Sequence, residues 1–137
     1  MASDIGDQVR ADVARRAGHR CEYCLIHEND AGFPHQVDRV VSRKHGGTSA
    51  IDNLAYACIL CNRYKGSDVA SIHPRTGDAV RLFHPRYDRW ADHFRLDADF
   101  IEPLSDTGSA TVRLLRLNAA ERLAERWLLS WPRHPAP

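Results

Sequence analysis

The first apolar positions along the chain recur at a helical interval. Val9 and Val13 lie four residues apart within residues 7–16, which places both side chains on one face of a helix. Ser3 or Asp4 precedes this stretch and offers a side-chain oxygen for an N-cap. The pattern therefore predicts a helix over residues 7–16.

The next apolar positions predict two strands and a helix in succession. Residues 36–41 hold three valines after a Gly-Phe-Pro break and predict a short strand, and residues 43–48 form a basic loop with two glycines. Residues 52–54 begin the returning strand. Residues 62–66 have the composition of a helix. The predicted order is strand, loop, strand, helix.

The second half of the chain predicts further short elements. Residues 71–78 are rich in turn formers and precede a predicted strand over residues 79–83. Residues 93–96 and 100–104 predict a β-hairpin across the Asp-Ala-Asp sequence between them.

The last periodic segment predicts a helix over residues 119–129. Asn118 is in place to act as its N-cap, and Leu123, Trp127 and Leu128 form an apolar stripe. We expect Trp127 to be a core or interface anchor rather than a platform for stacking bases, because it lies far from the basic part of the chain.

The composition fits one folded domain. The chain has 137 residues, 43% of them hydrophobic and 27% charged, which is typical of globular proteins and argues against disorder. Without an internal repeat or a long linker, we expect residues 1–70 and 71–137 to be a core and an extension packed on it. No apolar run approaches the roughly 20 residues of a membrane helix, and the first ten residues do not resemble a targeting signal. The expectation is a cytoplasmic protein outside the membrane.

The charge changes this picture only when it is counted by region. Lys and Arg number 19 against 18 Asp and Glu, a net charge of +1 that makes no general case for a polyanionic partner. Residues 10–66, however, contain nine basic and six acidic residues, a local net charge of +3. The candidates for tracking a phosphate backbone are Arg43, Lys44, Arg63 and Lys65. The alternative is ordinary solvated surface charge.

The four cysteines form two C-x-x-C pairs, Cys21 with Cys24 and Cys58 with Cys61. Two such turns supply the four sulfurs of a tetrahedral zinc site. The alternatives are disulfides, which a chain without a secretion signal rarely keeps, and a redox motif, which needs only one pair. We predict a structural Zn²⁺. Four cysteine ligands leave no open position for a catalytic water.

These motifs together resemble the HNH endonuclease family. The resemblance covers residues 20–66 and rests, in order, on Cys21-x-x-Cys24, Val37-Asp38-x-Val40, His45-Gly46-Gly47-Thr48, Asp52-Asn53-Leu54 and Cys58-x-x-Cys61-Asn62-x-x-Lys65-Gly66. It implies an α+β fold: a ββα-metal (His-Me finger) core stapled by a four-cysteine zinc site, here followed by a β-hairpin and helical extension. It also implies one catalytic Mg²⁺ or other divalent cation and hydrolysis of DNA phosphodiester bonds.

The resemblance also assigns roles to individual residues. Asp38 and Asn62 would be the two protein ligands of the divalent ion, and a carboxylate suits a hard cation. Asn53 would pin the loop, and Lys65 would contact phosphate.

One family residue is replaced. The family carries His directly after the acidic ligand, as the general base, where this chain has Arg39. A guanidinium stays protonated and cannot accept a proton from water. Loss of a positioned base costs on the order of 10²–10⁴-fold in rate. His45, in the adjacent loop, is the candidate to replace it, although a loop or phosphate-contacting role is the alternative.

The sequence therefore predicts a metal-dependent HNH endonuclease that is slow or inactive because of Arg39. The alternative is a catalytically dead HNH-fold module that binds DNA. A protein-interaction module built on zinc is the third hypothesis, and it applies if no nucleic acid binds.

Overall fold

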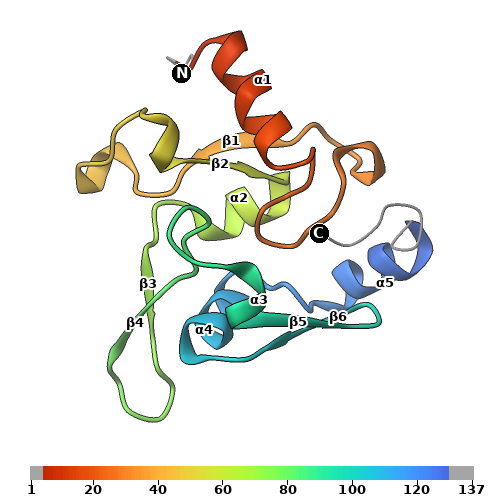
Figure 1. Cartoon of the computed structure of the whole chain (residues 1–137). Helices are drawn as coiled ribbons and strands as arrows, with labels where there is room; N and C mark the ends of the chain where they lie inside the picture. Colours follow the sequence, from red (N-terminus) through yellow and green to blue (C-terminus); the bar gives the residue numbers. More distant parts are fainter. Residues whose placement is uncertain (1–4, 130–137) are drawn as a thin grey trace.

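The computed structural model describes residues 5–129 and shows short helices and strands around one main core (Figure 1). Within this range no helix has the length and apolar character needed to cross a membrane. The elements are, in order, α1 (Asp7–Arg16), β1 (Gln36–Arg39), β2 (Leu54–Ala57), α2 (Ile59–Lys65), β3 (Ala70–Ile72), β4 (Ala79–Arg81), α3 (Trp90–His93), β5 (Phe94–Asp97), β6 (Phe100–Pro103), α4 (Asp106–Leu114) and α5 (Ala120–Leu129).

Strands β1 and β2 pair antiparallel and lead directly into α2. Asp38 lies opposite Ala55, and its side chain faces inward while those of its two neighbours in the strand are less buried. The predicted order of strand, loop, strand and helix is present. The first strand is shorter than predicted, because the chain leaves the ladder after Arg39 and turns toward the loop.

The loop between β1 and β2 requires its two glycines. Gly46 has φ +86°, a left-handed conformation that side chains with a Cβ rarely adopt. At Gly47 a Cβ atom would lie 1.7 Å from the carbonyl oxygen of Val41. The backbone of the loop therefore packs directly against the end of the strand that precedes it.

Helix α1 lies against the hairpin. Val13 is fully buried in a small cluster with Ile5 and Leu54. The helix has the predicted bounds, but the N-cap is Gly6 in an extended conformation and gives no side-chain hydrogen bond. The prediction of Ser3 or Asp4 as the cap is therefore wrong, and both of these residues lie outside the described range.

The second half contains two more antiparallel hairpins, β3–β4 and β5–β6. The β5–β6 hairpin is the predicted one. Strand β3 was not predicted, because its three residues merge with a segment rich in turn formers. In Figure 1 the β3–β4 hairpin projects from the rest of the molecule, and α4 packs against its base and against β6.

The main core is shared by the two halves. Cysteines and Tyr23 from the first half pack in one cluster with Phe83, Phe94, Ile101 and Leu115 from the second. The indole Nε1 of Trp90 also donates to the backbone oxygen of Tyr23 at 3.0 Å. The β5–β6 hairpin and its neighbours therefore pack directly behind the cysteine turns.

Helix α5 is oriented differently from the prediction. Trp127 and Leu128 are each 76% exposed, and the buried positions are Arg122 and Arg126. Trp127 is thus no core anchor in this chain. Asn118 does not cap the helix either, because its side-chain amide bonds both the N–H and the carbonyl of Ile101 in β6.

Candidate functional site

The four cysteines converge on one point. Cys21 and Cys24 lie in a turn closed by the bridge between Arg20 and His27, and Cys58 and Cys61 begin α2. All four side chains are buried and unpaired by disulfides, and the sulfurs lie within 4.8 Å of one another. Backbone N–H groups already point at two of the sulfurs: the N–H of Cys24 at Cys21 Sγ and that of Cys61 at Cys58 Sγ.

This group fits a tetrahedral metal ion. Zn–S bonds of about 2.3 Å in a tetrahedron put sulfurs about 3.8 Å apart, and the sulfurs of Cys24 and Cys58 are 3.7 Å apart. Burial raises the pKa of the Cys21 and Cys61 thiols, so positive charge is needed to hold them as thiolates. The four cysteines can therefore hold a metal ion.

Asp38 is held in a buried network beside α2. The hydroxyl of Tyr23 donates to Oδ2 of Asp38 at 2.9 Å, and the Lys65 ammonium lies 3.2 Å from the same oxygen and 3.5 Å from Oδ1. Lys65 also donates to the backbone oxygen of Val40 at 3.0 Å. Asp38 is 6% exposed and Lys65 1%. The charge of Asp38 is thus balanced within the protein.

While Lys65 is seated against Asp38, this arrangement opposes a divalent cation on that carboxylate. Both carboxylate oxygens have a donor, and a second cation at ligand distance would sit against the Lys65 ammonium in a region of low polarity. Burial also raises the pKa of Asp38, although the charge of Lys65 and the bond from Tyr23 oppose this. The predicted partner ligand Asn62 donates to the side-chain oxygen of Gln36 at 2.5 Å.

Lys65 does not occupy the place predicted for it. Its ammonium is buried against Asp38 and Val40, so in this arrangement it is turned away from any phosphate outside the protein. The other predicted phosphate contacts, Arg43, Lys44 and Arg63, are exposed.

Arg39 follows Asp38 on the strand and is partly exposed. Its guanidinium donates to the hydroxyl of Ser49 from Nε at 3.2 Å and from Nη2 at 3.0 Å. Alternation along a strand places its side chain on the opposite face from Asp38. His45 is exposed in the short 3-10 turn Arg43–His45 of the same loop.

Asn53 ties this loop to the strand. Its Oδ1 accepts from the N–H of Val41 at 3.0 Å, and its Nδ2 donates to the carbonyls of Val41 at 2.8 Å and Thr48 at 2.7 Å. These three bonds use the oxygen of the amide as an acceptor and its nitrogen as a donor, a combination that no other side chain of this size offers. In this structure Asn53 therefore holds the loop against the end of β1.

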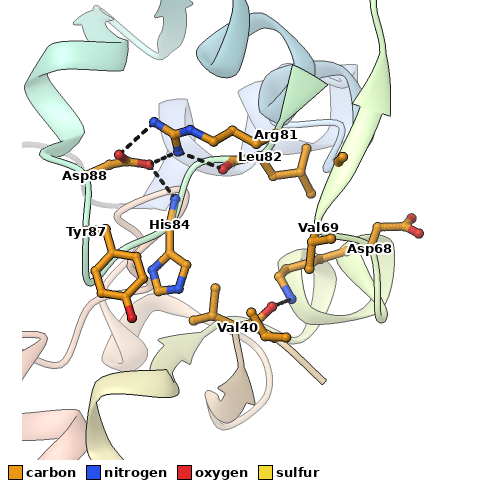
Figure 2. A pocket seen from close by; sticks show the side chains of 11 residues that line it. Val40, Asp68, Val69, Arg81, Leu82, His84, Tyr87 and Asp88 are labelled. Atoms are coloured by element: carbon orange, nitrogen blue, oxygen red, sulfur yellow. Dashed lines mark hydrogen bonds and ion pairs between the residues drawn. The ribbon is translucent and has the colours of Figure 1, made fainter. Parts of the chain in front are cut away.

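A pocket of about 500 Å³ opens next to this network and includes Val40 and Lys65 in its wall. Figure 2 shows His84 and Tyr87 on one side of it, facing Val40 and Val69. The two rings stack with centroids 4.1 Å apart, and burial lowers the pKa of His84. Sequence reasoning gave His84 no role, because its stretch forms no motif with a known chemical task.

Arg122 is the second residue that sequence reasoning missed. Its Nη2 lies 3.0 Å from the sulfur of Cys61 although the two residues are 61 positions apart. Nothing in the local sequence distinguishes this arginine from the other charged residues of a surface helix.

Comparison with protein-family models matches residues 21–68 to the HNH endonuclease family. The comparisons with curated proteins and with solved structures gave no match. The matched segment contains the four cysteines, both strands of the first hairpin and α2. Residues 21–68, called the HNH segment below, therefore match the HNH endonuclease family model, as the resemblance predicted.

Proposed function

We propose that this protein binds DNA through its HNH segment and hydrolyses phosphodiester bonds slowly at most. The observation that carries this proposal is the arginine directly after Asp38 in β1, with its guanidinium bonded to Ser49, where the resemblance implies a general-base histidine. The family match supports a nucleic-acid partner and, as a class, nuclease chemistry.

Exposed basic side chains support the DNA-binding part of the proposal. Arg43 and Lys44 are exposed in the loop after β1, and Arg63 is exposed on α2, the helix that follows β2. Contacts of this kind bind phosphate without reading sequence, and they weaken steeply as salt rises.

Two features support slow chemistry. Arg39 cannot accept a proton from an attacking water, which costs on the order of 10²–10⁴-fold in rate. The second is the engagement of both Asp38 oxygens by Tyr23 and Lys65, which opposes the binding of a catalytic cation. For the cysteine group we propose Zn²⁺ in a structural role, because buried sulfur ligands favour it over harder cations.

An active Mg²⁺-dependent endonuclease is the second candidate. His45 is exposed in the loop beside Arg39, and His84 borders the pocket that reaches Lys65. A lowered pKa keeps the His84 imidazole neutral near pH 7, the form that accepts a proton. Either ring is a candidate base in place of the missing histidine.

The test compares cleavage and binding in the same preparations. Supercoiled plasmid is incubated with Mg²⁺ or Mn²⁺ and the natural protein, Arg39→His, or Arg39→His with Asp38→Ala. Binding to a fluorescent duplex is measured by anisotropy between about 50 and 200 mM salt. We expect salt-sensitive binding by all three proteins and cleavage by Arg39→His at least about 10²-fold faster than by the natural chain.

The possible results separate the hypotheses. Fast cleavage by the natural chain supports the second candidate, and its loss in His45→Ala or His84→Ala identifies the base. Cleavage that persists with Asp38→Ala removes that residue from the site. Absence of DNA binding by every variant contradicts the proposal and favours a protein-interaction module.

A further inference from the structure

Arg122 contacts the cysteine group from a distant part of the chain. It lies on α5, more than 50 residues beyond the end of the HNH segment, and is 2% exposed. Its Nη2 is 3.0 Å from Cys61 Sγ and 3.7 Å from Cys58 Sγ, and its Nη1 donates to the carbonyl of Leu115 at 2.9 Å.

The contact has an electrostatic reason. Four thiolates around a divalent ion carry a net charge of −2, and this group is fully buried. A buried arginine without a negative partner is equally costly. Each group thus compensates for the desolvation of the other.

We propose that Arg122 is a positioning residue of the metal centre, which fixes the Cys61 sulfur in the ligand group and slows loss of the ion. An N–H···S bond of 3.0 Å to a ligand sulfur fixes the position of that sulfur, as outer-shell partners of metal ligands do. The metal centre then consists of four ligands from the HNH segment and one charged residue from α5.

The same helix supplies a matched control. Arg126 lies one turn further along, is 4% exposed, and donates to the carbonyl oxygens of Asp99 at 2.9 Å and Leu117 at 2.5 Å. It is buried like Arg122 and anchors the helix, but its hydrogen bonds go to oxygen. A comparison of the two positions therefore separates the sulfur contact from the docking of α5.

The experiment measures metal release and spectra, with no need for DNA. The zinc-loaded natural protein, Arg122→Met, Arg122→Lys and Arg126→Met are mixed with a colorimetric chelator, and the rate of Zn²⁺ transfer is followed. We expect release from Arg122→Met to be about 10- to 100-fold faster, since loss of an outer-shell partner has effects of this size. Arg122→Lys should be intermediate, because Lys restores the charge without the planar fork. Arg126→Met should stay within about threefold of the natural protein.

Cobalt substitution gives a second measurement. The sulfur-to-Co²⁺ charge-transfer band should shift in Arg122→Met and keep its position in Arg126→Met, because only Arg122 bonds a ligand sulfur. If Arg122→Met does not fold, Arg122→Lys against Arg126→Lys provides the same comparison, with faster release expected from the first.

Three results would overturn the proposal. Equal acceleration by the two substitutions would make Arg122 a helix anchor only. Unchanged release and an unchanged band in Arg122→Met would show that the sulfur contact has no effect on the ion. Failure of the natural protein to bind either Zn²⁺ or Co²⁺ would remove the metal centre itself. None of these depends on DNA binding, so the proposed function is tested separately.

Discussion

At the scale of single residues, the Asp38–Lys65 pair is the most consequential feature of the HNH segment. The two side chains are almost fully buried and form an ion pair. Asp38 also accepts from the hydroxyl of Tyr23, and Lys65 also donates to the carbonyl of Val40. Removing one partner of such a pair leaves an uncompensated charge in the interior. The pair therefore constrains the stability of the protein as well as its chemistry.

Substitution of the lysine should show this directly. We expect Lys65→Met to lower the free energy of unfolding by about 3–5 kcal/mol, because Asp38 is left buried and charged. Urea unfolding followed by circular dichroism gives the value. The double variant Lys65→Met with Asp38→Asn should regain part of the loss, because the stranded charge is gone. A loss in Lys65→Met below about 1 kcal/mol would mean that the pair is not formed as described.

A second residue-scale prediction concerns pH. Asp88 accepts from both terminal nitrogens of Arg81, at 2.6 and 3.0 Å, and from the N–H of His84 (Figure 2), and the bond from Arg81 is the main cause that lowers its pKa. A carboxyl whose pKa is lower in the folded state stabilises the fold above its unfolded pKa of about 3.9 and loses that contribution as pH falls further.

The difference in unfolding free energy between the natural chain and Asp88→Asn should therefore be about 1 kcal/mol at pH 7, a value kept small by the exposure of Arg81. It should shrink as pH falls below about 4. Urea titrations of both proteins from about pH 7 to about pH 3 measure it. A difference that grows in acid has the wrong sign and would show that Asp88 is not held as an ion pair.

The sequence predicted the types of the site residues better than their partners. The cysteine spacing implies convergence on one point, and the four sulfurs converge. The spacing of Asp38 and Lys65 gives no sign of Tyr23, the third member of their network, which reaches Asp38 from 15 positions upstream. Contacts of this kind are decided by tertiary packing, which also accounts for Arg122.

At the scale of elements, the loop between β1 and β2 depends on close backbone packing. A methyl group at Gly47 would overlap the carbonyl of Val41, whereas Gly32 has open space around it and an ordinary backbone conformation. We expect Gly47→Ala to destabilise the protein by about 1–3 kcal/mol through the forced backbone shift, and Gly32→Ala to stay within about 0.5 kcal/mol of the natural chain.

Thermal unfolding of the two glycine variants makes this comparison. Because Asn53 bonds the same carbonyl of Val41, Gly47→Ala should also disturb the bonds that hold Asn53. The signal of the Asn53 side-chain amide in an NMR spectrum should therefore move in Gly47→Ala and not in Gly32→Ala. Equal stability of the two variants would contradict the close packing of the loop.

Element prediction succeeded where the local pattern and the tertiary surroundings agree. The hairpin β5–β6 and helix α1 follow their patterns. The buried face of helix α5 does not follow its pattern. Arg122 and Arg126 are buried there because they bond the Cys61 sulfur and the carbonyl of Leu117, and Trp127 is exposed. An apolar stripe predicts the buried face only where the facing surface is itself apolar.

At the scale of the whole molecule, the cysteine group links the two halves. The main core contains residues of both the HNH segment and the second half, and Arg122 on α5 joins the cysteines directly. A metal bound only by the folded protein stabilises it by its full binding free energy. Loss of the metal should therefore unfold the second half of the chain as well as the cysteine turns.

A chain with Trp127→Phe and Trp131→Phe tests this, because Trp90 is then its only tryptophan and bonds the backbone of Tyr23. We expect about one zinc per chain in the purified protein. Removal of the zinc by a chelator at about pH 7 should shift the Trp90 fluorescence and the far-ultraviolet circular dichroism at the same rate, and added Zn²⁺ should reverse both. If the dichroism of the helices persists while Trp90 becomes exposed, the two halves unfold separately, and the metal stabilises only the HNH segment. A single shared rate would instead make the metal centre the point on which both halves depend, because neither keeps its part of the common core without the other.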